Sequence, residues 1–305
     1  MDTKGTQLGN LFKNMKLYII GNGFDIHHGL KTKYSDYKEF LLKNNFLSAN
    51  ELRKFEAGDY RISKLLEEDW SNVEEALCYD FSEMVYQAYV TFPVDLMDDS
   101  DSRWDNMVIE CDRLLSIPSK IIGNNFLKWI SSINLDNAKN KIDIDKSGYF
   151  ITFNYTKTLE QVYNIKNNQI LHLHGIYDRK IQFGNNENNP NVIREELDRQ
   201  YSDKEWYGAT YSRGIDIFQK YCLNTYKDLE KNVKLMKNWL KKKKIDEIVI
   251  YGHKILEVDS FYYENYLFKI FKSCKWVVYY HKNSEKTELE EYFKKFNIFP
   301  KFLIW

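Results

Sequence analysis

The chain of 305 residues is long enough to bury a sizeable core, as one large domain or two modest ones. Its hydrophobic share of 43% and charged share of 29% are those of an ordinary globular protein, and Lys+Arg and Asp+Glu both number 44. This balance argues against a protein whose main activity is to coat nucleic acid, because such binding depends on neutralising many phosphates.

Cysteine usage and the absence of a targeting segment indicate a cytoplasmic protein. The four cysteines are dispersed and form no CxxC pair, which fits a reducing compartment and gives no zinc signal. No signal peptide is visible, and no apolar run is long enough to span a membrane. We expect residues 1–14 to form a polar N-terminal extension and residues 15–305 to form a single domain.

Short apolar runs, rich in β-branched and aromatic residues, predict the strands. They lie at 17–20, 149–153, 169–174, 247–252 and 275–281, and the C-terminal FLIW is a candidate for a last strand. The runs are nearly continuous in apolarity, as in strands covered on both faces, and helical patterns lie between them. The sequence therefore predicts an α/β fold with crossover helices around a parallel sheet.

A large helical insertion, at about 34–146, separates the first predicted strand from the second. Within it, Ser48 and Glu51 have the spacing of a capping box, and Gly58 is a plausible stop for the helix they open. Ser71 and Glu74 have the same spacing and predict a second helix that continues to about residue 88.

Two more helices are expected in the same insertion. The first begins at about Ser102 and stops near Pro118, because proline removes a helical hydrogen bond. The second runs through Phe126, Trp129 and Ile133. A second excursion follows at about 184–240, where the polar loop GNNENNPN precedes helical patterns; we expect this segment to act as a lid.

Polar clusters follow four of the predicted strands, at the point where each strand ends. They are GNGFD (21–25), FNYT (153–156), HLHG (172–175) and GHKILEVD (252–259). The carboxyl ends of parallel strands share one edge of a sheet and line a crevice where the strand order reverses. Motifs more than a hundred residues apart are thus expected to face the same ligand.

Each cluster also has a purely local explanation, and these explanations remain open at this point. GNGFD fits a tight strand-to-helix turn, and both Asn154 and Asp259 are suited to capping a following helix. His172 and His174 are two apart on a strand, so they point to opposite faces and only one can line the crevice. For His27 and His28, ligand contact and solvent exposure are about equally expected.

The clusters, in this order, resemble the bacterial abortive-infection AbiH family. The resemblance includes GNGFD with HGLxTxY through Tyr34, WxxxE at 70–74, FNYTxTLE at 153–160, HLHG at 172–175 and GHxxxxxD at 252–259. One motif departs from the family pattern, since Lys254 stands where a serine is usual.

The AbiH pattern is in turn similar to sirtuin-like NAD-binding domains of antiphage proteins, several of which hydrolyse NAD. This resemblance implies a Rossmann-like, sirtuin-like sheet and a catalytic pair at Asn154 and His174, which we take as the site of an NAD glycohydrolase. It implies NAD as substrate, with nicotinamide and ADP-ribose as products and no metal, since the dispersed cysteines offer no zinc module. His174 has the ordinary pKa, ~6.5, that suits a base.

The same resemblance assigns nucleotide-binding positions to the first and last clusters. Gly21 and Gly23 would let backbone amides approach a pyrophosphate, and Asp25 would point to ribose or to the nicotinamide amide. Asp259 would either cap the following helix or bind the adenosine ribose. The full set of expected nucleotide-binding residues is Gly21, Asn22, Gly23, Phe24, Asp25, Gly252, His253 and Asp259.

Two other functions compete with the enzyme. A nucleotide-sensing module of a defence system would need the same glycines and Asp259 but no base. Nucleic-acid processing is supported mainly by the basic run at 231–244, yet lysines at a helix C-terminus complement its dipole, and zero net charge disfavours nucleic acid as a partner. An NAD-depleting enzyme must be latent, so we expect release by a phage component, a defence partner or rearrangement of a homo-oligomer, with no membrane involved.

Overall fold

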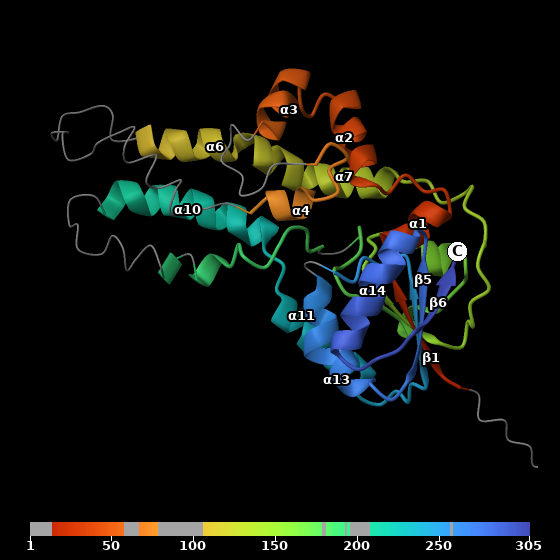
Figure 1. The fold of residues 1–305 in the computed structure, drawn as a ribbon. Helices are drawn as coiled ribbons and strands as arrows, with labels where there is room; N and C mark the ends of the chain where they lie inside the picture. The colour runs from red at the N-terminus through yellow and green to blue at the C-terminus, as the bar shows by residue number, and fades with distance from the viewer. Residues whose placement is uncertain are drawn as a thin grey trace, which may run out of the picture.

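The computed structural model describes residues 14–57, 67–78, 106–178, 181–192, 194–195, 208–256 and 259–305. Six strands form one all-parallel sheet in the order β3-β2-β1-β4-β5-β6 (Figure 1). They are β1 Lys16–Ile20, β2 Tyr149–Thr152, β3 Ile170–His172, β4 Glu247–Tyr251, β5 Lys275–Tyr280 and β6 Lys301–Ile304. This is the strand order of a Rossmann-like fold, and it confirms all five expected strands and the C-terminal sixth. The proposed extension at 1–14 lies, except for residue 14, outside the described residues.

The described helices all lie between β1 and β6 in the chain. Those ahead of β2 are α1 Asn22–His27, α2 Tyr34–Lys43, α3 Ala49–Glu56, α4 Val73–Ala76, α6 Asn106–Ile122 and α7 Asn124–Ser132. Those between β2 and β4 are α8 Thr158–Gln161, η3 Asn167–Gln169, α10 Gly208–Thr225 and α11 Leu229–Leu240. Those after β4 are α12 Ser260–Tyr262, the π-helical turn η5 Tyr263–Leu267, α13 Phe268–Ile270 and α14 Asn283–Lys295. Among the described residues, no helix is both long and apolar enough to cross a membrane.

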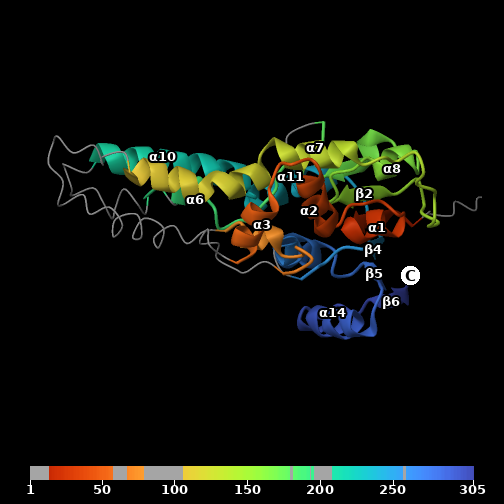
Figure 2. The ribbon, with the colours of Figure 1, turned by 90° about the horizontal axis from the view of Figure 1, so that it is seen from above.

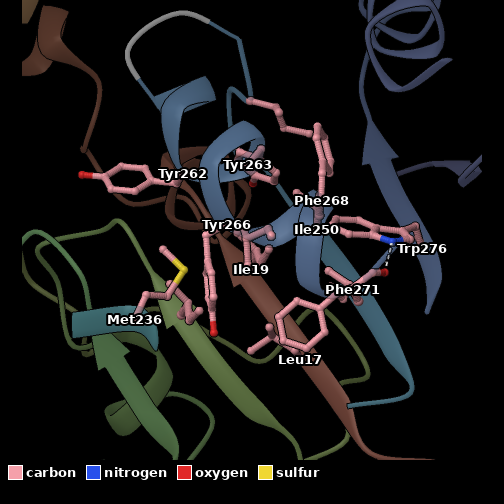
Figure 3. Packing of buried hydrophobic residues seen from close by; sticks show 14 of the residues in the cluster. Leu17, Ile19, Met236, Ile250, Tyr262, Tyr263, Tyr266, Phe268, Phe271 and Trp276 are labelled. Atoms are coloured by element: carbon pink, nitrogen blue, oxygen red, sulfur yellow. Dashed lines mark hydrogen bonds between the residues drawn. The ribbon is translucent and has the colours of Figure 1, made fainter. Parts of the chain in front are cut away.

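Both faces of the sheet are buried, which explains the nearly continuous apolarity of its strands. In β1, Leu17 and Ile19 belong to one core and Tyr18 and Ile20 to the opposite one. The first core packs against α11, α14 and the helical run α12-η5-α13, as Figure 3 shows for Met236, Tyr266 and Trp276. The second core includes side chains of α1 and α8.

The helical insertion has a core of its own, above the carboxyl edge of the sheet (Figure 1). Its buried side chains come from α2, α3, α4, α6 and α7, and Phe218, Tyr221 and Cys222 of α10 join them from the second excursion. Both ribbon views show α6 and α10 side by side, reaching away from the sheet (Figure 2). Two excursions from different parts of the chain therefore share one apolar interior.

Two expectations about the insertion are wrong. The segment from Ser71 to Glu74 forms no capping box, because Asn72 is the N-cap of α4 and the Ser71 hydroxyl bonds to Glu67. Helix α6 does not stop near Pro118 but continues to Ile122. Its buried side chains on both sides of the proline, including Ile121, pack into the insertion core and offset the missing hydrogen bond. The parts of these predictions at 79–105 lie outside the described residues.

The first capping box is confirmed, and it allows a matched test. Ser48 accepts a bond from the Glu51 amide at 3.2 Å, and the Glu51 carboxylate accepts one from the Ser48 amide at 2.8 Å. We expect Ser48→Ala to lower the free energy of unfolding by about 1 kcal/mol. Ser71→Ala, which removes a serine from the same sequence pattern but no cap, should cost less than half as much by denaturant titration. Equal losses would contradict the assignment of the cap.

Candidate functional site

A cavity of about 490 Å³ lies between the carboxyl edge of the sheet and the helical insertion. All four polar clusters contribute to its wall, through Asn22, Asn154, His174 and His253 among others. The expectation that these distant motifs face one space is therefore confirmed. The insertion closes the opposite side with aromatic and acidic side chains, from Tyr34, Glu74, Glu75, Phe126 and Trp129.

The first and last clusters are joined by close backbone contact, which explains their glycines. The Gly23 amide donates to the Gly252 carbonyl at 2.8 Å, and the Gly21 amide donates to the Tyr251 carbonyl at 3.0 Å. A Cβ on Gly21 would lie 2.3 Å from His253 Cα, and one on Gly23 would lie 2.7 Å from Gly252 Cα. Both backbone amides therefore donate hydrogen bonds within the protein. The two glycines allow the segment after β1 to lie close to the segment after β4.

Asp25 lies at the base of the cavity and is almost fully buried, with 1% of its surface exposed. One carboxylate oxygen accepts a bond from Thr156 at 2.5 Å and the other accepts one from Thr158 at 2.7 Å. Burial raises the pKa of Asp25 to about 6, although the hydrogen bonds from Thr156 and Thr158, and the neighbouring Asn154 side chain, act in the opposite direction. This aspartate therefore organises the segment that follows β2.

Asn154 lines the cavity, and its side-chain oxygen is buried. The residue is 6% exposed, its side chain acts to lower the pKa of Asp25, and its Oδ1 has no hydrogen-bond partner among the described residues. It does not cap the next helix, since Lys157 is the N-cap of α8. A buried acceptor without a partner costs free energy, so this oxygen is suited to receive a bond from a ligand.

His174 is buried just beyond β3 and lines the cavity. Its Nε2 lies 3.1 Å from the Tyr262 hydroxyl and 3.8 Å from Asp259 Oδ1. Burial and the positive charge of Lys227 lower the pKa of His174 to about 3. The imidazole is thus neutral at pH 7 and can accept a hydrogen bond.

His253, which is buried, and Asp259, whose side chain is 22% exposed, form a second pair on the same wall. His253 Nε2 lies 3.2 Å from Asp259 Oδ2, and its Nδ1 lies 2.8 Å from the Tyr263 hydroxyl. Burial acts to raise the pKa of Asp259, but the bond from His253 and the charge of Lys227 outweigh it and hold that pKa below its usual value. Asp259 does not cap α12 through its side chain, and its Oδ1 has no hydrogen-bond partner among the described residues.

Two adjacent tyrosines hold these histidines. Tyr262 and Tyr263 stand at the junction of α12 with the π-helical turn η5, and each hydroxyl reaches a different imidazole. Asn232 of α11 also donates to the Tyr262 hydroxyl, at 3.0 Å. π-Helical turns occur frequently at functional sites, which agrees with this position.

A buried charged group that the sequence did not single out connects the insertion to this wall. Lys227 is 3% exposed and forms an ion pair with Glu74 of α4, which also accepts a bond from the Tyr34 hydroxyl. Burial acts to lower the pKa of Lys227, but Glu74 and Asp259 outweigh it and raise that pKa. The WxxxE motif includes Glu74 and so draws attention to it. Lys227 belongs to no motif that distinguishes it from the other lysines of the sequence.

Some candidates lie away from the cavity. Gly21 and Phe24 are not among its lining residues; Phe24 packs against His28 at 4.5 Å between ring centroids. His28 bonds to Tyr163 and His27 stacks on Trp305, so neither lines the cavity. His172 Nε2 lies 2.8 Å from Glu160 Oε1, and His172 does not line the cavity, whereas His174 does, as expected.

The basic run near residue 240 contacts its own helix. Lys243 donates to the Trp239 carbonyl at the C-terminal end of α11 and lies over the Trp239 ring at 4.1 Å. This arrangement agrees with cations complementing a helix C-terminus.

Lys254, which replaces the serine usual in this motif, lies on the cavity wall. The pKa of Asp69, another lining residue, is lowered mainly by hydrogen bonds from Ser71 and further by the charge of Lys254. The positively charged side chain of Lys254 therefore lies on the cavity wall at the position where the family motif usually has a serine.

The polar side chains that line the cavity fit a small ligand with hydroxyl groups. The volume is in the range of small-molecule sites, and three lining residues each hold a buried oxygen that has no hydrogen-bond partner among the described residues: Thr32 Oγ1, Asn154 Oδ1 and Asp259 Oδ1. Within the described part of the chain, no group of three or more His, Cys, Asp or Glu side chains is placed to hold a metal ion.

Comparisons with known proteins agree with the motif pattern. A sequence model of the family described as "Bacteriophage abortive infection AbiH" matches residues 17–280. No match is found among curated proteins or among solved structures.

Proposed function

Because the chain belongs to the AbiH family of bacteriophage abortive-infection proteins, we propose that it defends its host by hydrolysing NAD to nicotinamide and ADP-ribose. The proposal assigns the cavity at the carboxyl edge of the Rossmann-like sheet as the active site. In such folds, nucleotides bind at this edge, beside the point where the strand order reverses. Here that point lies between β1 and β4, whose loops both line the cavity.

One observation carries the proposal. Asn154 and His174 follow different strands, yet both line the same cavity, and the Asn154 oxygen is buried there without a protein partner. A carboxamide oxygen can accept a bond from a ribose hydroxyl or from water without adding charge. These two residues are the pair that the resemblance to sirtuin-like domains implies.

The reaction requires little covalent help from the protein. The bond from ribose C1′ to the nicotinamide nitrogen breaks, its electron pair neutralises the leaving group, and a water oxygen bonds to C1′ as it gives up a proton. His174, being neutral, is the group we assign to accept that proton, with Asn154 holding the ribose or the water. The carboxylates of Asp25, which is buried, and of Asp259 would favour the cationic transition state.

Latency is part of the proposal, since constant NAD depletion would harm the host. Glu74 of the insertion holds Lys227, whose charge acts on both His174 and Asp259. A phage component, a defence partner or a second copy that moves the insertion would therefore change the electrostatics of the site.

The test is release of nicotinamide from NAD by the purified protein, under conditions that include extracts of phage-infected cells. We expect release by the wild type and a loss of at least about 100-fold in Asn154→Ala and His174→Gln. His172→Gln is the matched control, because His172 is outside the cavity and should leave the rate unchanged. Nicotinamide release that is equal in wild type and both cavity variants would show that the activity has another source.

A nucleotide-sensing role is the second candidate, and one observation favours it. A pKa of about 3 makes His174 a weak base at neutral pH, which suits hydrogen bonding to a ligand better than proton transfer. A sensor would bind NAD or ADP-ribose tightly with no turnover under any activating condition. Calorimetry in parallel with the nicotinamide assay separates the two functions.

A further inference from the structure

The glycine amides after β1 are already engaged in hydrogen bonds within the protein. The Gly21 amide donates to the Tyr251 carbonyl, and the Gly23 amide donates to the Gly252 carbonyl. These are the amides that the sequence suggested for a pyrophosphate, and each N–H group has only one hydrogen to donate. An anionic group of a ligand therefore depends on cationic side chains of the cavity wall.

Three lysines from the described part of the chain line the cavity: Lys33, Lys227 and Lys254. Lys227 is buried, and Glu74 compensates its charge. Lys33 and Lys254 are exposed. A lysine has a flexible four-carbon stem, so an exposed ammonium group can adjust its position to a ligand. These two lysines are thus the cations best placed to receive an anionic group.

Two hydrogen bonds bring the segments of both lysines to the same turn. Asn22 Nδ2 donates at 2.7 Å to the carbonyl of the residue that precedes Lys33. The Gly23 amide donates at 2.8 Å to the carbonyl of Gly252, two residues before Lys254. Asn22 and Gly23 themselves line the cavity. The two cations therefore belong to one part of the wall, beside the turn that follows β1.

We propose that Lys33 and Lys254 form a phosphate-binding site in this cavity, in which Lys254 supplies a charge that the usual serine cannot. Each ammonium group can hold a phosphate oxygen by a charge-assisted hydrogen bond. The identification of this phosphate as the diphosphate of NAD rests on the proposed function. The phosphate site itself does not.

Inorganic pyrophosphate is the probe that tests the site without the rest of the nucleotide. We expect Lys33→Met and Lys254→Met each to weaken its binding about tenfold by calorimetry. Lys254→Arg keeps the charge and should bind within about threefold of the wild type. Lys31→Met is the matched control, because Lys31 is exposed on the same loop but is not among the lining residues. An equal loss in Lys31→Met, or a wild type that does not bind pyrophosphate, would overturn the proposal.

A carboxylate on the same wall provides a variant of opposite sign. Asp69 lines the cavity, and the charge of Lys254 contributes to the lowering of its pKa. A phosphate must therefore compete with Asp69 for Lys254. We expect Asp69→Asn to bind pyrophosphate about threefold more tightly than the wild type. An affinity that stays the same or falls would remove Lys254 from the phosphate contact.

The kinetic consequence separates the phosphate site from the proposed function. With NAD, Lys33→Met and Lys254→Met should raise KM and leave kcat within about twofold, because the phosphate is held equally in the ground state and the transition state. Nicotinamide release with an unchanged KM in both variants would refute the phosphate site and leave the hydrolase standing. If pyrophosphate binds as expected but the wild type releases no nicotinamide, the hydrolase is wrong and the phosphate site stands.

Discussion

Gly252→Ala is expected to lower the free energy of unfolding by about 2–5 kcal/mol. Gly252 has a φ of +55°, and a left-handed backbone costs alanine about 1–2 kcal/mol. The added Cβ would also lie 2.4 Å from the Phe24 nitrogen and 2.6 Å from Gly23 Cα. Because these atoms are backbone, α1 would have to move away from β4, and overpacking of this kind costs a further ~1–3 kcal/mol.

Gly29 provides the matched control for this substitution. Its φ is +80°, but a Cβ there would meet nothing within 4 Å. Gly29→Ala should therefore cost only the backbone strain of about 1–2 kcal/mol. Denaturant titration of both variants gives the comparison, and equal losses would show that the contact between α1 and the end of β4 is not a tight one.

Lys227→Met is expected to lower the free energy of unfolding by about 3 kcal/mol at pH 7. It leaves the partly buried Glu74 without its ion pair and removes the charge that lowers the Asp259 pKa. Lys120→Met is the control, because the Lys120–Glu51 pair at 2.7 Å is at the surface and should contribute at most about 1 kcal/mol.

The pH dependence of Lys227→Met has a defined sign. In the wild type, the depressed pKa of Asp259 contributes stability that is present above the ordinary carboxyl pKa of ~3.9 and is lost as pH falls toward the folded-state value. In the variant that pKa rises, so the stability deficit should be greatest at neutral pH and should shrink below pH ~4 as the carboxylates are protonated. A deficit that stays constant or grows with acid would mean that Lys227 stabilises the fold by packing alone.

The sheet and the location of the site could be predicted from the sequence for a physical reason. A strand covered on both faces must be apolar at nearly every position, so β1 and β4 are visible as uninterrupted runs. The parallel arrangement then places the residues that follow each strand at one edge. Asn154 and His174 could be assigned to a common cavity without any knowledge of the side chains between them.

Much of the wall could not be predicted in this way. Lys227, Asn232 and Tyr262 belong to helices or loops whose position relative to the sheet depends on tertiary packing, and no local pattern distinguishes them. The spacing of Ser71 and Glu74 fits a capping box, yet burial gave Glu74 a stronger partner in Lys227. Local hydrogen-bond rules fail where a distant charge competes for the same carboxylate.

The side-by-side packing of α6 and α10 also constrains how the protein can change over evolutionary time. Each helix covers apolar side chains of the other, although 85 residues of chain, 123–207, lie between them. Trimming either one by a turn would expose part of its neighbour to water. Insertions and deletions in one excursion are therefore tolerated only when the other gains or loses a matching length.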